Sequence, residues 1–116
     1  MKSAKIVFER NGIKLEYKDE IFDENTKEKI HHKVSVNEKE YIIFSGQVSR
    51  DNIGQTMKTY LDSFRDILND AIRIQEKDFK VILVTQPEYV MFVLLQKSML
   101  ENFKEIVKHT KNKLEE

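Results

Sequence analysis

The segment 79–95 restricts the possible folds of this chain more than any other. It contains two dense apolar runs, at 81–84 and 89–95, which are separated by Gln-Pro-Glu at 86–88. A strand that is apolar on both faces must be covered on both faces. The remaining segments alternate or follow helical spacing instead. We therefore expect the core of the protein to lie around 79–95.

Two structures are compatible with this segment. A β-hairpin is favoured, because the residues that follow position 88 are mostly β-branched or aromatic and 86–88 suits a turn. A second capping pattern at 98–101 would then start a final helix over 99–114. The alternative is one long C-terminal helix from about residue 87, because residues 85–88 also read as a capping box with proline in the first turn.

Asn11-Gly12 predicts a type I′ turn near the N-terminus, because both residue types tolerate positive φ. A two-residue loop there pairs 6–10 with 13–17, and this register places the apolar residues of both strands on one face. The acidic stretch 18–28 that follows is expected to be a loop.

Two further strands are expected at 29–36 and 41–48. Pairing Val36 with Ile42 keeps their apolar residues together and sets His32 opposite Gly46. With the first hairpin, these strands predict a four-stranded antiparallel sheet with one apolar and one solvated face.

A long amphipathic helix is predicted from about Ile53 to Glu76, because apolar residues recur there every three or four positions. The sequence therefore predicts a single α+β domain over 1–116, in the order ββββ-α-ββ-α. Its sheet is mostly antiparallel, and its two helices pack on one face. If the helix from residue 87 forms instead, the order becomes ββββ-α-β-α.

Composition narrows the classes of function. The chain of 116 residues has no cysteine, and its 20 basic and 20 acidic residues give a formal net charge of zero. Disulfides and thiolate metal sites are therefore excluded, and no net field draws the protein to nucleic acid or membranes. The apolar runs are shorter than the roughly 20 residues of a membrane span. We expect a cytoplasmic protein.

No motif predicts catalysis or a cofactor. His31 and His32 are adjacent on a predicted strand, so they point to opposite faces and cannot share a metal ion. The chain has neither a glycine-rich phosphate loop nor a nucleophile elbow. We therefore expect no enzyme, no cofactor and no metal site.

The apolar excess at 79–95 is the main functional signal, because a short chain can hardly cover both faces of a broad sheet. It predicts a non-enzymatic protein-interaction module, acting as an adaptor, regulator or inhibitor and forming a homodimer through this segment. The candidate partner-binding residues are Tyr89, Met91 and Phe92.

The alternative function is nucleic-acid binding through a lysine-bearing face of the N-terminal sheet. Its candidate residues are Lys14, Lys29, His31 and Lys33. Acidic residues share this face, and aromatic side chains that could stack on bases are absent from it.

Overall fold

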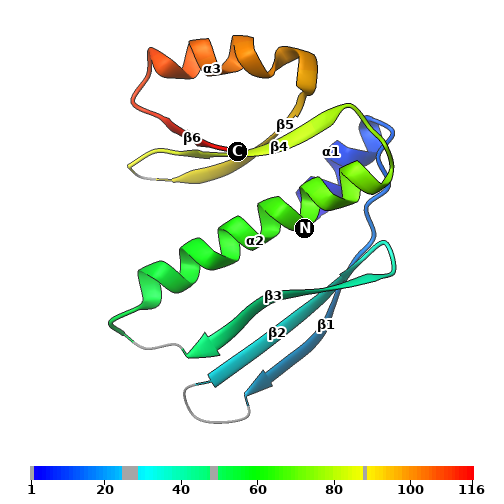
Figure 1. Cartoon of the computed structure of the whole chain (residues 1–116), viewed down its shortest axis with the longest axis vertical. Coiled ribbons are helices and arrows are strands. Elements are labelled where there is room, and N and C mark those ends of the chain that lie inside the picture. The colour runs from blue at the N-terminus through cyan, green and yellow to red at the C-terminus, as the bar shows by residue number, and fades with distance from the viewer. Residues whose placement is uncertain (1, 25–28, 48–49, 88) are drawn as a thin grey trace.

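Helix α2 (Ile53–Ile74) lies between two separate antiparallel sheets (Figure 1). The computed structural model describes residues 2–24, 29–47, 50–87 and 89–116, with the backbone alone for 2, 19–24, 29 and 30. The other elements are α1 (Lys2–Arg10), β1 (Tyr17–Glu24), β2 (Lys29–Val36), β3 (Lys39–Gln47), β4 (Phe79–Thr85), β5 (Val90–Gln96), the 3-10 turn η1 (Lys97–Met99), α3 (Leu100–Lys108) and β6 (Lys113–Glu115).

The strands are grouped as β1-β2-β3 in an N-terminal sheet and as β5-β4-β6 in a C-terminal sheet. Figure 1 shows four layers: α3, the C-terminal sheet, α2 with α1, and the N-terminal sheet. The predicted α+β class with antiparallel sheets is confirmed. The order of elements differs from the prediction, because it is α-βββ-α-ββ-α-β. The helices also do not share one face, since α3 lies on the far side of the C-terminal sheet from α2.

The N-terminus forms a helix, so the predicted hairpin around Asn11-Gly12 is wrong. Ile13 N–H donates to Phe8 C=O at 2.9 Å and Gly12 N–H to Glu9 C=O at 3.1 Å. These two bonds and the positive φ of Gly12, 72°, make a Schellman ending of α1. Phe8 and Ile13 are both buried, which supplies the hydrophobic contact of that motif. The Asn-Gly pair therefore ends a helix here.

Two predictions about the N-terminal sheet are also wrong. The part of the predicted acidic loop at 18–24 belongs to strand β1, which pairs with β2 from Tyr17 to Glu24, and the rest of that prediction, 25–28, lies outside the described residues. The register of β2 and β3 is set by a tighter turn than expected, since Asn37 and Glu38 both have positive φ and Val36 pairs with Lys39. The two-residue turn fixes the pairing because its twist matches that of the strands.

A bulge in β3 explains why the alternation in this strand was misleading. The pairing shifts between His32 and Lys33, so that Ile43 has no partner of its own on β2. Ile43 and Phe44 are consequently both buried, whereas Ile42 is exposed. His32 lies opposite Phe44, not opposite Gly46.

The β-hairpin over 79–95 is confirmed, and the long helix from residue 87 is wrong. β4 and β5 pair without a shift from Phe79–Gln96 to Thr85–Val90. The last helix is shorter than predicted: α3 ends at Lys108, and Leu114 belongs to the short strand β6. β6 pairs with the free side of β4.

The core joins the N-terminal sheet to β4 through α2, which is the long amphipathic helix that the sequence predicts. Tyr60 of α2 stacks on Phe44 with ring centroids 5.1 Å apart, and Phe64 contacts Tyr17 at 6.3 Å. The buried cluster also includes Val34, Val36, Ile67, Leu68, Ala71, Ile72 and Val81. Because α2 serves both sheets, β4 is covered within a single molecule.

Candidate protein-binding surface

The two strands of the central hairpin differ sharply in exposure. In β4, Val81, Ile82, Leu83 and Val84 are each no more than 4% exposed. α2 lies on one face of β4 and α3 on the other (Figure 1). In β5, by contrast, Val90, Met91 and Phe92 are 43, 41 and 38% exposed, and Tyr89 before the strand is 48% exposed. The apolar excess of 79–95 is therefore hidden in β4 and presented to solvent in β5.

The backbone of β5 presents an open edge, and its direction follows from Asn69. Asn69 of α2 donates to Val81 C=O at 2.9 Å and accepts from Val81 N–H at 2.7 Å. Both backbone groups of Val81 therefore point away from β5. In an antiparallel ladder the residue opposite such a position also points outward. Val81 pairs with Leu94, so Leu94 and its even-numbered neighbours direct their N–H and C=O groups away from β4.

An apolar groove runs beside this edge. It lies between α1, α2 and the hairpin, with a volume of about 550 Å³. Its lining residues from the two nearest elements include Ala4 and Val7 of α1 and Phe92 and Leu94 of β5. Phe8, Tyr17, Phe64, Leu68 and Val81 form much of the rest. Such a groove suits apolar side chains of a bound strand.

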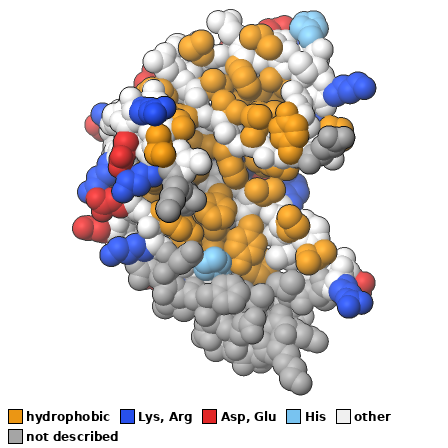
Figure 2. All heavy atoms as spheres, turned by 180° about the vertical axis from the view of Figure 1, so that it is seen from behind, with side chains coloured by type: hydrophobic (Ala, Val, Ile, Leu, Met, Phe, Trp, Pro, Cys, Tyr) orange, Lys and Arg blue, Asp and Glu red, His pale blue; other side chains and the backbone are white. Residues whose placement is uncertain are grey.

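A space-filling view supports this description. Figure 2 shows the molecule from behind, with hydrophobic side chains gathered over the middle and upper part of this face and charged side chains mostly toward its margin. Large contiguous apolar areas are uncommon on monomeric proteins and typically mark interaction sites.

The described edges of the two sheets are protected in different ways, except for β5. β1 has Lys18 near its start and a register shift, and β3 begins with Lys39-Glu40 and contains a bulge. β6 has three residues, two of them charged. β5, with the sequence VMFVLLQ, has seven residues, no charge, no proline and no shift. Charges, bulges and shortness prevent strand addition, and β5 has none of them.

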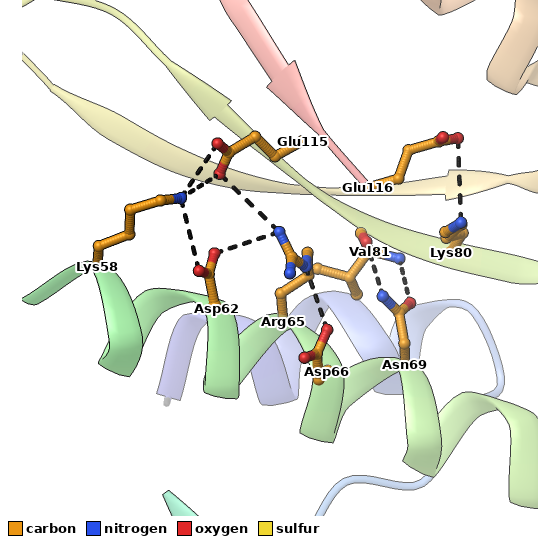
Figure 3. A network of polar contacts seen from close by, with 9 residues as sticks. All are labelled: Lys58, Asp62, Arg65, Asp66, Asn69, Lys80, Val81, Glu115 and Glu116. Carbon is orange, nitrogen blue, oxygen red and sulfur yellow. Dashed lines mark hydrogen bonds and ion pairs between the residues drawn. The ribbon is translucent and has the colours of Figure 1, made fainter. Parts of the chain in front are cut away.

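Polar side chains gather on the other side of α2, where they connect it to β6 (Figure 3). Glu115 contacts Lys58 Nζ through both oxygens, each at 3.1 Å, and Arg65 at 3.9 Å. Arg65 also lies 3.3 Å from Asp62 and from Asp66. The hydrogen bond to Glu115 raises the pKa of Lys58. These ion pairs hold β6 and α2 together, which leaves the opposite edge, β5, as the open one.

A second charged cluster joins α2 to the N-terminal sheet. Asp70 accepts hydrogen bonds from Lys39 Nζ, at 2.8 Å, and from the Tyr41 hydroxyl and Arg73. Hydrogen bonds from Lys39, Tyr41 and Arg73 hold the pKa of Asp70 well below its usual range. Burial and the bond to Asp70 raise the pKa of Tyr41. Both oxygens of Asp70 are engaged in structural contacts, so this carboxylate is tied to neighbouring side chains.

The predicted partner-binding residues lie at β5, beside its open edge, but on different faces of the hairpin. Phe92 lines the groove on the α1 side. Met91 alternates with Phe92 along β5 and so lies on the α3 side, and Tyr89 precedes the strand. The sequence reasoning missed Val7 and the whole contribution of α1, because it assigned that segment to a strand. The signal that was available in the sequence is the uncharged run VMFVLLQ at 90–96.

The residues of the nucleic-acid alternative are brought together only in part. Lys29, His31 and Lys33 alternate along β2, whereas Lys14 lies in the connection between α1 and β1. Lys33 pairs with Glu40 at 3.2 Å, and His31 Nδ1 lies 3.0 Å from Ser45 Oγ. Nucleic-acid binding by this face stays a prediction.

The histidines lie apart from one another. His32 Nδ1 is 3.1 Å from the Tyr60 hydroxyl on the α2 side of β2, and His31 lies on the opposite side. Among the side chains that the structure describes, no three histidine or acidic residues are grouped as metal ligands. Among these same residues, none of the helices has the length and apolar character required to span a bilayer. Comparison with protein-family models, curated proteins and solved structures finds no match to this chain.

Proposed function

We propose that this protein is a non-enzymatic protein-interaction module that works in the cytoplasm as an adaptor, regulator or inhibitor. Its binding surface is the edge of β5 together with the apolar groove beside it. The observation that carries the proposal is that β5 is long, uncharged and half exposed at the end of its sheet. An extended segment of another chain would gain main-chain hydrogen bonds at this edge and place its side chains in the groove.

The composition of the surface supports protein binding over the binding of a charged ligand. Aromatic residues and methionine are enriched at the centres of protein interfaces, whereas lysine and acidic residues are depleted there. Tyr89, Met91 and Phe92 follow this pattern. The charged clusters of Arg65 and Asp70 lie on α2, where their partners come from this same chain.

A double substitution, Val90→Lys with Met91→Lys, tests the proposal. Both side chains are more than two-fifths exposed, so the variant should fold like the parent. The matched control is Ile106→Lys, which adds a charge at a 65% exposed position on α3. Circular dichroism and thermal unfolding establish that all three proteins are folded.

The readout combines solution mass with capture from a cell extract. We expect either a mass above the monomer or a defined set of retained proteins for the parent chain and for Ile106→Lys. The β5 variant should lose both. A parent chain that is strictly monomeric, and that retains the same proteins as the β5 variant, would contradict the proposed function.

A further inference from the structure

We infer that the occupant of the β5 edge is a second copy of this chain, paired antiparallel about a two-fold axis at Val93. The inference rests on the proposed function, because it names the partner of the same surface. The two C-terminal sheets would join into one continuous sheet, in the order β6-β4-β5 followed by β5-β4-β6 of the second copy. Two-fold dimers are the commonest closed assemblies of identical chains.

The register follows from the direction of the backbone groups. Val90, Phe92, Leu94 and Gln96 point their N–H and C=O groups away from β4, as the Asn69–Val81 bonds establish. Two other bonds of the hairpin agree, since Gln86 N–H donates to Tyr89 C=O at 2.8 Å and Lys97 N–H to Asp78 C=O at 3.0 Å.

These outward residues are arranged symmetrically about Val93. When Val93 faces its own equivalent, Phe92 lies opposite Leu94 and Val90 opposite Gln96 of the second copy. All seven residues of β5 then overlap, and the outward N–H and C=O groups of each strand meet those of the other. Moving the axis by half a residue would set outward groups against inward ones, and moving it by a whole residue would leave two residues at one end of each β5 unpaired.

The absence of charge from β5 makes this strand compatible with a second copy as the occupant. Pairing identical strands brings identical residues near one another, so any charge in β5 would face a like charge across or near the axis. β5 has no charged residue, and the whole chain has a formal net charge of zero. Neither the local contact nor the overall field therefore opposes self-association.

The groove and α1 can supply the additional buried area that a stable dimer requires. Specific interfaces bury on the order of 1,200–2,000 Å² in total, more than two paired strands supply. α1 lies on the Phe92 side of the hairpin, where Val7 lines the groove. Val7 is 43% exposed and its neighbour Ile6 52% exposed. Strand pairing would bring the α1 helices of both copies next to the axis, so these residues would also be covered.

Single cysteines provide the test, because the chain contains none. In the proposed register, Val93 faces its equivalent in a non-hydrogen-bonded pair, with Cα atoms about 4.5 Å apart. This spacing suits a disulfide. Met91 faces Leu95 of the second copy instead, so its own equivalent is four residues further along, about 13 Å away. Met91 is nevertheless the more exposed of the two positions.

We expect Val93→Cys to form a disulfide-linked dimer rapidly and nearly completely under mild oxidation. Met91→Cys should react at least tenfold more slowly. Random collision would give the opposite ranking, because Met91 is the more accessible. The reduced Val93→Cys protein must retain the circular dichroism of the parent chain and its dimeric mass by light scattering. The parent mass provides a second measurement should the Val93 variant not fold.

Three outcomes would overturn the inference: a strictly monomeric parent at every concentration, a dimer that the double substitution Val90→Lys with Met91→Lys leaves intact, or a Met91→Cys protein that cross-links as fast as Val93→Cys. The first would leave the proposed function standing if the β5 edge still captures another protein. The proposed function fails only when capture is also insensitive to the β5 variant.

Discussion

The side-chain amide of Asn69 takes the place of a missing strand next to Val81. It donates to the carbonyl and accepts from the amide of the same residue, at 2.9 and 2.7 Å. β6 pairs with β4 from Leu83 to Thr85, so its ladder ends before Val81 is reached. Asn69 thus pairs the backbone groups of Val81 on the side of β4 that faces away from β5, where a buried donor and acceptor would otherwise be unpaired.

Replacing Asn69 should therefore destabilise the hairpin. Asn69→Ala leaves both groups of Val81 without a partner, and we expect the free energy of unfolding to fall by about 1–3 kcal/mol. Asn69→Asp keeps an acceptor for Val81 N–H but, when ionised, repels the carbonyl. Only its protonated form can donate, so this variant should recover part of its stability in acid. Urea unfolding as a function of pH measures both effects.

The matched control for Asn69 is Asn52, whose side chain donates to Gln47 C=O at 3.0 Å near an exposed turn. Asn52→Ala should cost less than Asn69→Ala, because water can replace its bond. Equal losses of unfolding free energy at the two positions would show that the bonds to Val81 contribute no more to stability than an exposed hydrogen bond.

Asp70 should make the stability of this protein depend on pH in acid. Its pKa is lowered from the ordinary value of 3.8 by hydrogen bonds from Lys39, Tyr41 and Arg73. A carboxylate with a lowered pKa stabilises the folded state fully above its unfolded pKa. That stabilisation is lost as the pH falls from 3.8 toward the folded value. We expect Asp70→Asn to be less stable than the parent at neutral pH and to approach it in acid.

Asp66→Asn is the control for this experiment, because the Asp66 side chain is 71% exposed. It should change the pH dependence much less than Asp70→Asn does. Denaturant unfolding at neutral pH and at about pH 2.5 gives the comparison. A difference between Asp70→Asn and the parent that is the same at both pH values would contradict the proposed linkage.

The sequence predicted α2, and it favoured a hairpin over 79–95 above the alternative of a long helix from about residue 87. α2 was predicted because its apolar residues recur over many turns, and the 79–95 hairpin because β-formers dominate its second half. The N-terminal helix was missed because Ile6 and Phe8 also fit a strand, and Asn-Gly favours a hairpin turn locally. Ala4 and Phe8 are four residues apart and both pack on the core, which favours a helix over a strand in this segment.

The candidate site was predictable only in part for a related reason. The exposure of Tyr89, Met91 and Phe92 follows from an apolar excess that is visible in the sequence. The position of β5 at the end of a sheet depends on β6, a three-residue strand without a pattern of its own. Asn69 and Val7 complete the arrangement, and neither role can be read from neighbouring residues. Long-range pairing determined these features.

Replacing Gly12 should lower the free energy of unfolding because of its backbone conformation, and not because a larger side chain would clash there. Its φ is 72°, and a Cβ atom added there would meet no heavy atom within 4 Å. Gly12→Ala should therefore cost about 1 kcal/mol, the strain of a non-glycine residue in the left-handed region. Gly54, which has the same free space but no positive φ and lies in the first turn of α2, is the matched control. Gly54→Ala should be neutral or stabilising, and a similar loss at both positions would contradict the Schellman ending of α1.

Substitutions of Arg65 and Lys58 distinguish the effect of burial from the effect of charge on stability, where α2 contacts β6. Both contact Asp62 and Glu115, but the side chain of Arg65 is 12% exposed and that of Lys58 is 57% exposed. Arg65→Met leaves three carboxylates around a partly buried gap, so we expect a loss of about 1–3 kcal/mol in unfolding free energy. Lys58→Met should have a much smaller effect, because water and salt screen an exposed pair.

Amide hydrogen exchange of β6 shows whether this loss is local. The amides of Lys113 to Glu115 should exchange faster in Arg65→Met than in Lys58→Met, because Arg65 helps to tie β6 to α2. Added salt should weaken the parent only slightly, since Arg65 is shielded from solvent. If both variants lose the same stability and the loss disappears in high salt, the network acts as ordinary surface charge. Burial of Arg65 would then have no part in holding β6 in the sheet.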